Sequence, residues 1–265
     1  MKPAIEVRGL TFSYPDGRVA IAGIDLDIRV GERVAILGPN GAGKTTLMLQ
    51  LNGVLTATSG SVKISGVELK RAALQDIRRR VGIVFQDPDD QLFMPTVAQD
   101  VAFGPANFGV TGEALSQRVK AALESVGMLD NADRSAAHLS GGQRRRVALA
   151  SVLACEPDVL ILDEPSANLD PVARRELAET LMTLDTTMLL VTHDIPYAAQ
   201  LCERVVVLDR GIIVADGRAA DIFSDHAMLA RHRLELPWGF SIPPDHGERS
   251  WTAVSPSTPR PDRNH

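Results

Sequence analysis

The chain has 265 residues, with 28 Lys and Arg against 33 Asp and Glu, which gives a net charge of −5. This length corresponds to one or two domains, and 45% hydrophobic with 23% charged residues is typical of a globular protein rather than a disordered or fibrous one. The acidic balance argues against sequence-independent binding to nucleic acid, and no stretch approaches the roughly 20 apolar residues that cross a bilayer. The first residues lack the apolar core of a signal peptide, so the expected location is intracellular.

Short apolar runs alternate with helical patterns along most of the chain. Continuous apolarity over a few residues is typical of strands buried on both faces of a parallel sheet. The predicted buried strands are Arg33–Leu37, Val81–Phe85, Val159–Leu162, Met188–Thr192 and Arg204–Leu208. The predicted helices are Lys44–Asn52, Glu113–Val126, Gly142–Cys155 and about Pro171–Leu184. This alternation predicts an α/β fold.

Three regions depart from this alternation. Residues 4–30 and 60–69 alternate apolar and polar residues around Gly turns, which predicts an antiparallel edge sheet. Residues 88–155 contain no comparable apolar run and are predicted to form an inserted helical subdomain. Residues 243–265 hold five prolines and no periodicity, which predicts a disordered tail.

The two cysteines, Cys155 and Cys202, stand far apart, without a CxxC motif or a neighbouring His. We predict that both are buried small hydrophobes rather than part of a disulfide or zinc site.

Residues 38–45 read GPNGAGKT and match the pattern G-x-x-x-x-G-K-[ST] of a phosphate-binding loop. The match lies directly after a predicted strand and before a predicted helix, where backbone N–H groups and the helix dipole attract phosphate. Lys44 is expected to reach the β- and γ-phosphates and to take part in catalysis, and the Thr45 hydroxyl to bind Mg²⁺. The expected nucleotide contacts are Gly38, Pro39, Asn40, Gly41, Ala42, Gly43, Lys44, Thr45 and Thr46.

Two carboxylates, Asp163 and Glu164, follow the apolar run VLIL. In open α/β sheets, ligands bind at this end of the strands. We expect Asp163 to hold Mg²⁺ and Glu164 to position or deprotonate the attacking water. Because Asp and Glu also follow strands that carry no such site, the pair is significant only together with the phosphate loop.

A second candidate anion site is the sequence LSGGQ at Leu139–Gln143. Ser140 is a favourable N-cap, and the two glycines leave backbone N–H groups exposed at a helix N-terminus. An ordinary capped helix would account for Ser140 but not for Gly141, Gly142 and Gln143. The following Arg144–Arg146 are predicted to form a solvated helix face.

The phosphate loop, the LSGGQ segment and the Asp-Glu pair occur in the same order as in the nucleotide-binding subunit of an ATP-binding cassette (ABC) transporter. The chain resembles such a subunit over roughly residues 4–235. The resemblance implies a P-loop NTPase core with a mostly parallel sheet, an N-terminal antiparallel β subdomain and an inserted helical subdomain. It implies an ATPase domain at 1–240, with a disordered tail at 241–265. ATP and Mg²⁺ are the implied cofactors.

The resemblance also implies roles for residues outside these motifs. Tyr14 would stack on adenine, Gln86 would sense Mg²⁺ and water as a catalytic and metal-binding residue, and His193 would contact the γ-phosphate. Ser166–Asp170 would form the D-loop, with Asp170 among the nucleotide contacts, although Asn168 stands where the family often has a small residue. The sequence itself adds that Tyr14 precedes a PDG turn, so its ring is expected to be exposed.

Partners follow from the same resemblance. Two chains would pack head to tail, so that Ser140 of one closes over ATP held by Lys44 of the other, in a homodimer or with a paralogous ATPase. Integral membrane transport subunits at the cytoplasmic face of the cell membrane would be the further partners, and no nucleic acid is expected.

The stretch VFQDPDDQLF at 84–93 resembles the ATPases of energy-coupling-factor importers, which include cobalt and nickel transporters. Leu92, Phe93 and Met94 are expected either to form a groove for a partner helix or to belong to the subdomain core.

Two other functions compete with an importer ATPase. One is a soluble ABC ATPase acting on DNA, ribosomes or cofactor assembly, but the chain has neither a long coiled-coil insertion nor a second cassette. The other is a nucleotide-binding regulator without turnover, which the intact Lys44, Asp163, Glu164 and His193 disfavour.

Overall fold

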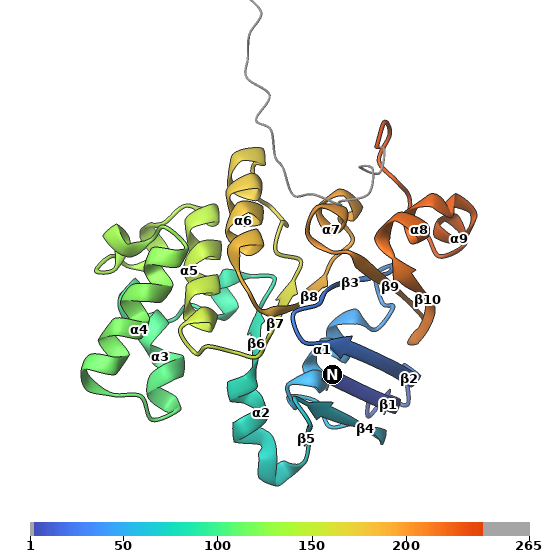
Figure 1. Cartoon of the computed structure of the whole chain (residues 1–265), viewed down its shortest axis with the longest axis horizontal. Coiled ribbons are helices and arrows are strands. Elements are labelled where there is room, and N and C mark those ends of the chain that lie inside the picture. The colour runs from blue at the N-terminus through green and yellow to red at the C-terminus, as the bar shows by residue number, and fades with distance from the viewer. Residues whose placement is uncertain (1–2, 241–265) are drawn as a thin grey trace, which may run out of the picture.

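The computed structural model describes residues 3–240, and the predicted tail at 241–265 lies outside them. A six-stranded sheet in the order β10-β9-β3-β8-β7-β6 forms its centre (Figure 1). Its strands are β3 (Arg33–Leu37), β6 (Val81–Val84), β7 (Val159–Asp163), β8 (Thr187–Val191), β9 (Arg204–Asp209) and β10 (Ile212–Arg218). All neighbours are parallel except β9 and β10, so the five predicted buried strands and the α/β class are confirmed.

Side chains of the central strands are buried alternately on the two faces of this sheet. On β3, Ala35 and Leu37 belong to a core shared with the helices that follow β6. Val34 and Ile36 belong to a second core, shared with α1 (Lys44–Leu51) and the N-terminal strands. Burial on both faces explains why these strands read as continuous apolar runs.

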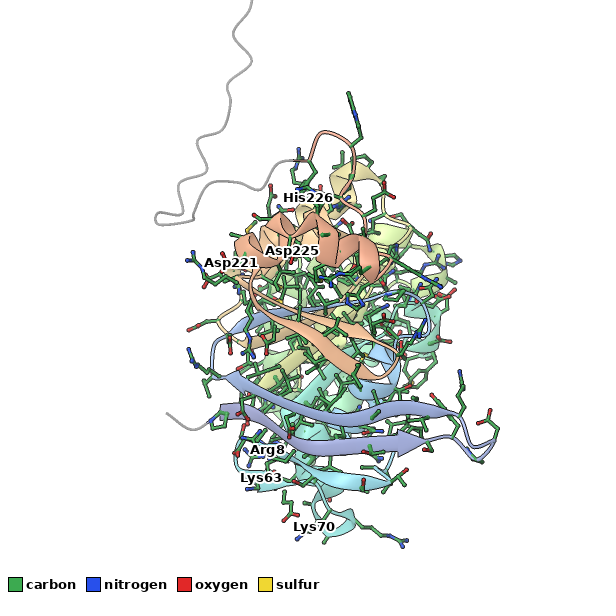
Figure 2. The ribbon with its side chains drawn as sticks, turned by 90° about the vertical axis from the view of Figure 1, so that its right-hand side faces the viewer. Arg8, Lys63, Lys70, Asp221, Asp225 and His226 are labelled. Carbon is green, nitrogen blue, oxygen red and sulfur yellow. The ribbon has the colours of Figure 1, made fainter. Side chains whose placement is uncertain are left out.

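The N-terminal strands form a separate antiparallel sheet in the order β2-β1-β4-β5. Its strands are β1 (Pro3–Ser13), β2 (Val19–Arg29), β4 (Ser59–Ile64) and β5 (Val67–Glu68). In Figure 2, Arg8, Lys63 and Lys70 mark this sheet at one end of the molecule. Asp221, Asp225 and His226 mark α8 (Ala219–Ser224) and α9 (His226–Arg231) at the other end.

Between β6 and β7 the described chain contains only helices and turns. The helices are α3 (Val97–Asn107), α4 (Gly112–Ser125) and α5 (Gly141–Leu153), with the short turns Pro88–Asp90, Leu129–Asn131 and Ala136–His138. They pack against one another beside the edge strand β6 (Figure 1). The boundary of the ATPase domain at residue 240 stays a prediction.

The remaining helices flank the sheets: α2 (Leu74–Arg80), which follows the turn Arg71–Ala73, α6 (Pro171–Thr183) and α7 (Ile195–Leu201). Of these, only α6 was predicted, and the predicted helices Lys44–Asn52, Glu113–Val126 and Gly142–Cys155 correspond to α1, α4 and α5. Cys202 is buried as predicted, whereas Cys155 is only half-buried. None of the helices in the described part of the chain is long and apolar enough to span a membrane.

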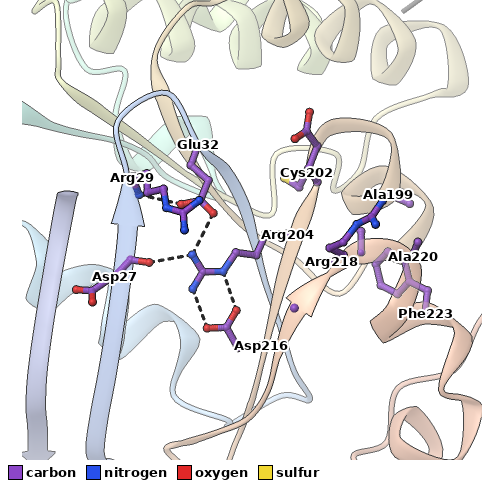
Figure 3. Close-up of a pocket in the computed structure, with 13 residues that line it drawn as sticks. Asp27, Arg29, Glu32, Ala199, Cys202, Arg204, Asp216, Arg218, Ala220 and Phe223 are labelled. Atoms are coloured by element: carbon purple, nitrogen blue, oxygen red, sulfur yellow. Dashed lines mark hydrogen bonds and ion pairs between the residues drawn. The ribbon is translucent and has the colours of Figure 1, made fainter. Parts of the chain in front are cut away.

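Arg204 at the start of β9 joins the two sheets (Figure 3). Its guanidinium donates two hydrogen bonds of 2.7 Å to the Asp216 carboxylate, one of 3.0 Å to Glu32 and one of 2.9 Å to the Asp27 carbonyl. The bonds to Asp216 are the main reason why the pKa of Arg204 is raised. These groups line a cavity of about 720 Å³. Because the Arg204 guanidinium donates these four hydrogen bonds to groups of both sheets and of the segment between them, we interpret this region as a structural joint.

Candidate functional site

Strand register brings the predicted motifs to one edge of the central sheet. Asp163 pairs with Val191 across β7 and β8, and Val191 pairs with Ile36 on β3. Val84 at the end of β6 pairs with Leu162. The carboxyl ends of these four parallel strands therefore coincide, and the segments that follow them face the same space.

A cavity of about 220 Å³ lies at this edge. Its walls combine predicted phosphate-loop, metal and catalytic residues with part of the β1–β2 turn. The lining residues are Tyr14, Arg18, Val19, Ala20, Asn40, Gly41, Ala42, Gly43, Lys44, Thr45, Thr46, Gln86, Asp163 and Glu164. Several residues that we predicted to contact the nucleotide do not line this cavity in the described part of the chain: Gly38, Pro39, Ser140, Gly141, Gly142, Gln143, Asp170 and His193.

Glycines of the phosphate loop are required by close backbone approaches. A Cβ at Gly38 would lie 2.1 Å from the Leu208 carbonyl oxygen on β9, and one at Gly43 would lie 2.5 Å from the Ala20 carbonyl oxygen. Gly43 has φ 104° and precedes α1, whose first turn has no side-chain cap among the described residues. The N–H groups of that turn therefore remain available for an anion.

Lys44 is buried at the floor of the cavity. Its Nζ donates to the carbonyl oxygens of Gly38 at 2.7 Å and Pro39 at 3.2 Å. Burial lowers the pKa of Lys44, and the charges of Glu164 and Asp163 oppose that shift. A cation is thus held inside the loop predicted to bind phosphate.

Asp163 and Thr45 form a hydrogen-bonded pair beside Lys44. Burial is the main cause that raises the pKa of Asp163 to about 6, and the Glu164 charge adds to it. Lys44 and a hydrogen bond from the Thr45 side chain act in the opposite direction. Carboxylate, hydroxyl and the amide oxygen of Gln86 are the ligand types that suit Mg²⁺, so this donor set fits the ion.

Glu164 leaves β7 in a left-handed backbone conformation with φ 45°. Its Oε1 lies 2.7 Å from Nδ1 of His193, and its Oε2 accepts 2.8 Å and 3.3 Å hydrogen bonds from the Thr192 hydroxyl and the His193 N–H. The structure therefore brings two of the predicted catalytic residues, Glu164 and His193, into direct contact.

Tyr14 lines the cavity, but its ring is half-buried rather than exposed as predicted. The Arg18 guanidinium lies 4.6 Å from the ring centroid, and Phe12 packs against the ring at 84°. The Tyr14 hydroxyl is 3.0 Å from the Thr46 hydroxyl of α1. The PDG turn folds Arg18 back over Tyr14, which sequence spacing alone did not reveal.

The LSGGQ segment caps α5, and the structure corrects our reading of its residues. The Ser140 N–H donates to the Gln143 side chain at 2.9 Å, and the Gln143 N–H donates to the Ser140 hydroxyl at 3.3 Å, a capping box. A Cβ on Gly142 would lie 2.9 Å from that of Ala173 on α6. A capped, closely packed helix therefore accounts for Gln143 and Gly142 as well, and only Gly141 lacks a local structural reason.

Arg145 contradicts the predicted solvated face of Arg144–Arg146, because only 3% of it is exposed. Its guanidinium donates to the carbonyl oxygens of Phe85, Gln86 and Ala167. Burial lowers its pKa. Sequence reasoning missed this contact between the α5 helix, the D-loop and the segment that carries Gln86 after β6, which we call the glutamine loop.

D-loop residues contact groups of the chain itself. Asp170 caps α6 by accepting hydrogen bonds from the N–H groups of Val172 and Ala173. Asn168 has φ 60°, a conformation that Asn tolerates better than most residues. The Ser166 hydroxyl donates to Asp194, which follows His193 and was also missed.

An aromatic surface patch, formed by Phe93 and Phe103, lies beside the acidic PDD turn of Pro88–Asp90. These side chains are 62% and 43% exposed, and their rings meet edge to face with centroids 4.9 Å apart. Met94 is half-buried and Leu92 is buried in the core. The core alternative is thus confirmed for Leu92, whereas docking of a partner helix at Phe93 stays a prediction.

Comparisons with known proteins show the family to which the chain belongs. The family model described as ABC transporter matches residues 21–167. A relative from Streptomyces avermitilis is 58% identical, with 90% of this chain and 91% of the relative covered. The energy-coupling factor transporter ATP-binding protein EcfA of Methanothermobacter thermautotrophicus is 46% identical, with 88% of this chain and 76% of EcfA covered.

Two solved structures are similar in fold. The chain cbiO1 of Clostridium perfringens, part of the ABC transporter complex cbiONQ, matches with a TM-score of 0.78 and 38% identity, over 89% of this chain and 97% of cbiO1. The ATP-binding cassette MJ0796, a dimer in a post-hydrolysis state with ADP and Pi, matches with a TM-score of 0.72 and 29% identity, over 81% of this chain and 98% of MJ0796. These matches confirm the predicted P-loop fold class. The chain belongs to the ABC transporter family and is an ATP-binding and ATP-hydrolysing protein.

Proposed function

We propose that this chain is the energy-coupling ATPase subunit of a membrane importer of the energy-coupling-factor type. The observation that carries the ATPase role is the convergence of Lys44, Asp163, Glu164 and Gln86 on one cavity. The importer type is supported by the 46% identity to EcfA and by the likeness to cbiO1. A vitamin, cobalt or nickel is the proposed class of cargo.

In this proposal the triphosphate lies along the phosphate loop. Backbone N–H groups between Gly41 and Thr46 that are not already donating within the loop bind phosphate oxygens, and Lys44 moves from its loop carbonyls to the β- and γ-phosphates. Thr45, Gln86 and Asp163 hold Mg²⁺, which when bound spreads the charge of the phosphate oxygens. The base lies against Tyr14 and the Arg18 guanidinium above it.

Hydrolysis is assigned to Glu164 and His193. Glu164 takes a proton from the attacking water, whose oxygen forms the new bond to the γ-phosphorus as the bond to ADP breaks. His193 contacts the γ-phosphate from its exposed side while its Nδ1 stays on Glu164. These roles are supported by the 2.7 Å contact between the two side chains.

The working unit is proposed to be a head-to-tail dimer, either of two copies or with a paralogous ATPase. LSGGQ does not line the cavity of its own chain among the described residues, so the site gains that segment, and Asp170, from a partner. The exposed N-terminus of α5, with Gly141 free of close neighbours, suits a γ-phosphate presented by the other chain.

The membrane subunits are proposed to dock on the patch of Phe93 and Phe103. Two exposed aromatic rings beside an acidic turn suit a partner helix with an apolar face and a basic rim. Docking would place the chain at the cytoplasmic face of the membrane as a peripheral subunit.

Co-purification and phosphate release test the proposal together. A tagged wild-type chain should be recovered from membranes with a polytopic protein and release phosphate from ATP, whereas Lys44→Ala should lose nucleotide binding. Exclusive recovery with a soluble complex would contradict the importer, and normal ATP affinity in Lys44→Ala would contradict the phosphate-loop assignment.

A further inference from the structure

The Glu164 carboxylate is held by the segment that follows β8. Thr192 and His193 between them supply three groups to its two oxygens, at 2.7 to 3.3 Å. Of these, the His193 ring is largely exposed, whereas Thr192 is fully buried, with 0% exposed. Of the two side chains that contact Glu164 here, only Thr192 is shielded from water, so water cannot take the place of its hydroxyl in the hydrogen bond to Glu164.

The hydrogen-bond direction at Thr192 is fixed by its neighbours. Its Oγ1 accepts a 3.0 Å hydrogen bond from the Asp194 N–H, which can only donate. The single hydroxyl hydrogen is then directed at Oε2 of Glu164, 2.8 Å away. Glu164 thus receives one oriented donor from a rigid, buried position.

Asp194 is itself fixed on three sides. Its carboxylate accepts hydrogen bonds from the Ser166 hydroxyl at 3.1 Å, the Arg174 guanidinium at 2.9 Å and the Tyr197 N–H at 3.0 Å. This support holds the backbone that follows Thr192, so the hydroxyl keeps its place.

We propose that the Thr192 hydroxyl is a positioning group that holds the Glu164 carboxylate in the orientation needed to accept a proton from the attacking water. The inference rests on the proposed role of Glu164. Thr192 is not among the described residues that line the cavity, so its effect on the reaction would pass through Glu164. Its loss lets the carboxylate rotate away from the cavity, and small misplacements of a catalytic group reduce the rate strongly.

Thr192→Val tests this inference because valine keeps the buried shape and removes the hydroxyl. We expect the rate constant kcat to fall about 10- to 100-fold, the range for a hydrogen bond to a charged acceptor, with ATP affinity within about 2-fold of wild type. Thr192→Ser restores the hydroxyl and should return kcat to within about 3-fold of wild type.

Thr187→Val is the matched control. Thr187 is the first residue of β8, at the end remote from Thr192; it is 2% exposed and accepts a 3.1 Å hydrogen bond from the Gly31 N–H. The control should lower the melting temperature about as much as Thr192→Val while leaving kcat unchanged. An equal fall of kcat in both variants, or no rescue by serine, would overturn the inference.

A double-mutant cycle separates this inference from the role of Glu164. In the Glu164→Gln background, adding Thr192→Val should change the residual rate by less than about 2-fold, because the carboxylate is already gone. A further 10-fold loss would overturn the inference. If Glu164→Gln alone kept the wild-type rate, the proposed role of Glu164 would fail, whereas an inactive Glu164→Gln with a fully active Thr192→Val would overturn the positioning role alone.

Discussion

Replacing Arg145 with methionine should destabilise the junction of three motif-bearing segments. The guanidinium joins α5 to the glutamine loop through Phe85 at 3.1 Å and through Gln86, and to the D-loop through Ala167 at 3.2 Å. Methionine keeps an unbranched apolar stem and removes all of these bonds.

The magnitude follows from two opposing contributions. Three hydrogen bonds from a charged donor correspond to roughly 5–9 kcal/mol, and removing a buried cation recovers several kcal/mol of desolvation. We expect a net loss of about 2–4 kcal/mol in the free energy of unfolding. For a chain of this size that is a fall of about 4–16 °C in melting temperature.

Urea and thermal unfolding of Arg145→Met and Arg175→Met provide the measurement. Arg175 forms an exposed pair with Glu179 at 3.6 Å on α6, so its loss should cost less than about 0.5 kcal/mol. If Arg145→Met were no less stable than this control, the guanidinium would not hold the three segments together. The Arg145 variant should also hydrolyse ATP more slowly, because the backbones of Gln86 and Ala167 lose their anchor.

Three further predictions concern catalysis, docking and pH. Glu164→Gln should slow phosphate release at least about 100-fold and shift the chain to a dimer with ATP in size-exclusion chromatography, and a wild-type rate would remove Glu164 from its role. Phe93→Lys should keep the basal rate of ATP hydrolysis within about 2-fold of wild type but abolish co-purification of the membrane partner. Val30→Lys, at an equally exposed residue, should keep both the basal rate and the co-purification. Unfolding of Phe93→Lys would contradict the docking role and indicate that the ring contributes to the core. Because burial raises the pKa of Asp163 to about 6, its contribution to stability is present below about pH 4 and is lost as pH rises through 6. Relative to Asp163→Asn, the wild-type nucleotide-free chain should therefore lose roughly 1–3 kcal/mol between pH 4 and 7 in urea unfolding, and a pH-independent difference would contradict the shift.

Features that depend on local chain order were predictable from the sequence. Gly38 and Asp163 each follow an apolar run, and parallel strands bring such positions to one edge whatever the length of chain between them. The same rule correctly placed Gln86 at that edge. The S-x-x-Q spacing of Ser140 and Gln143 is typical of a capping box, so the sequence predicts a local role for Gln143 as well as the N-cap role that we assigned to Ser140 alone.

Contacts between distant segments were not predictable. Nothing in the run Arg144–Arg146 distinguishes the buried middle residue from its neighbours, because the distinction depends on where the glutamine loop and D-loop pass. Arg18 over Tyr14 likewise depends on how one turn folds, and the bond from Thr192 to Glu164 joins residues that are 28 positions apart.

The Arg204 joint has a consequence for the ATP cycle. It fastens β2 and the segment before β3 to β9 and β10 through one side chain, whereas α3, α4 and α5 adjoin the opposite edge of the sheet at β6. If the base and the triphosphate bind as proposed, the residues that contact them at the start of β2 and after β3 belong to one frame, and we expect the distance between these two groups of residues to stay constant during turnover. Movement that reaches a membrane subunit would then be concentrated in the helices on the β6 side.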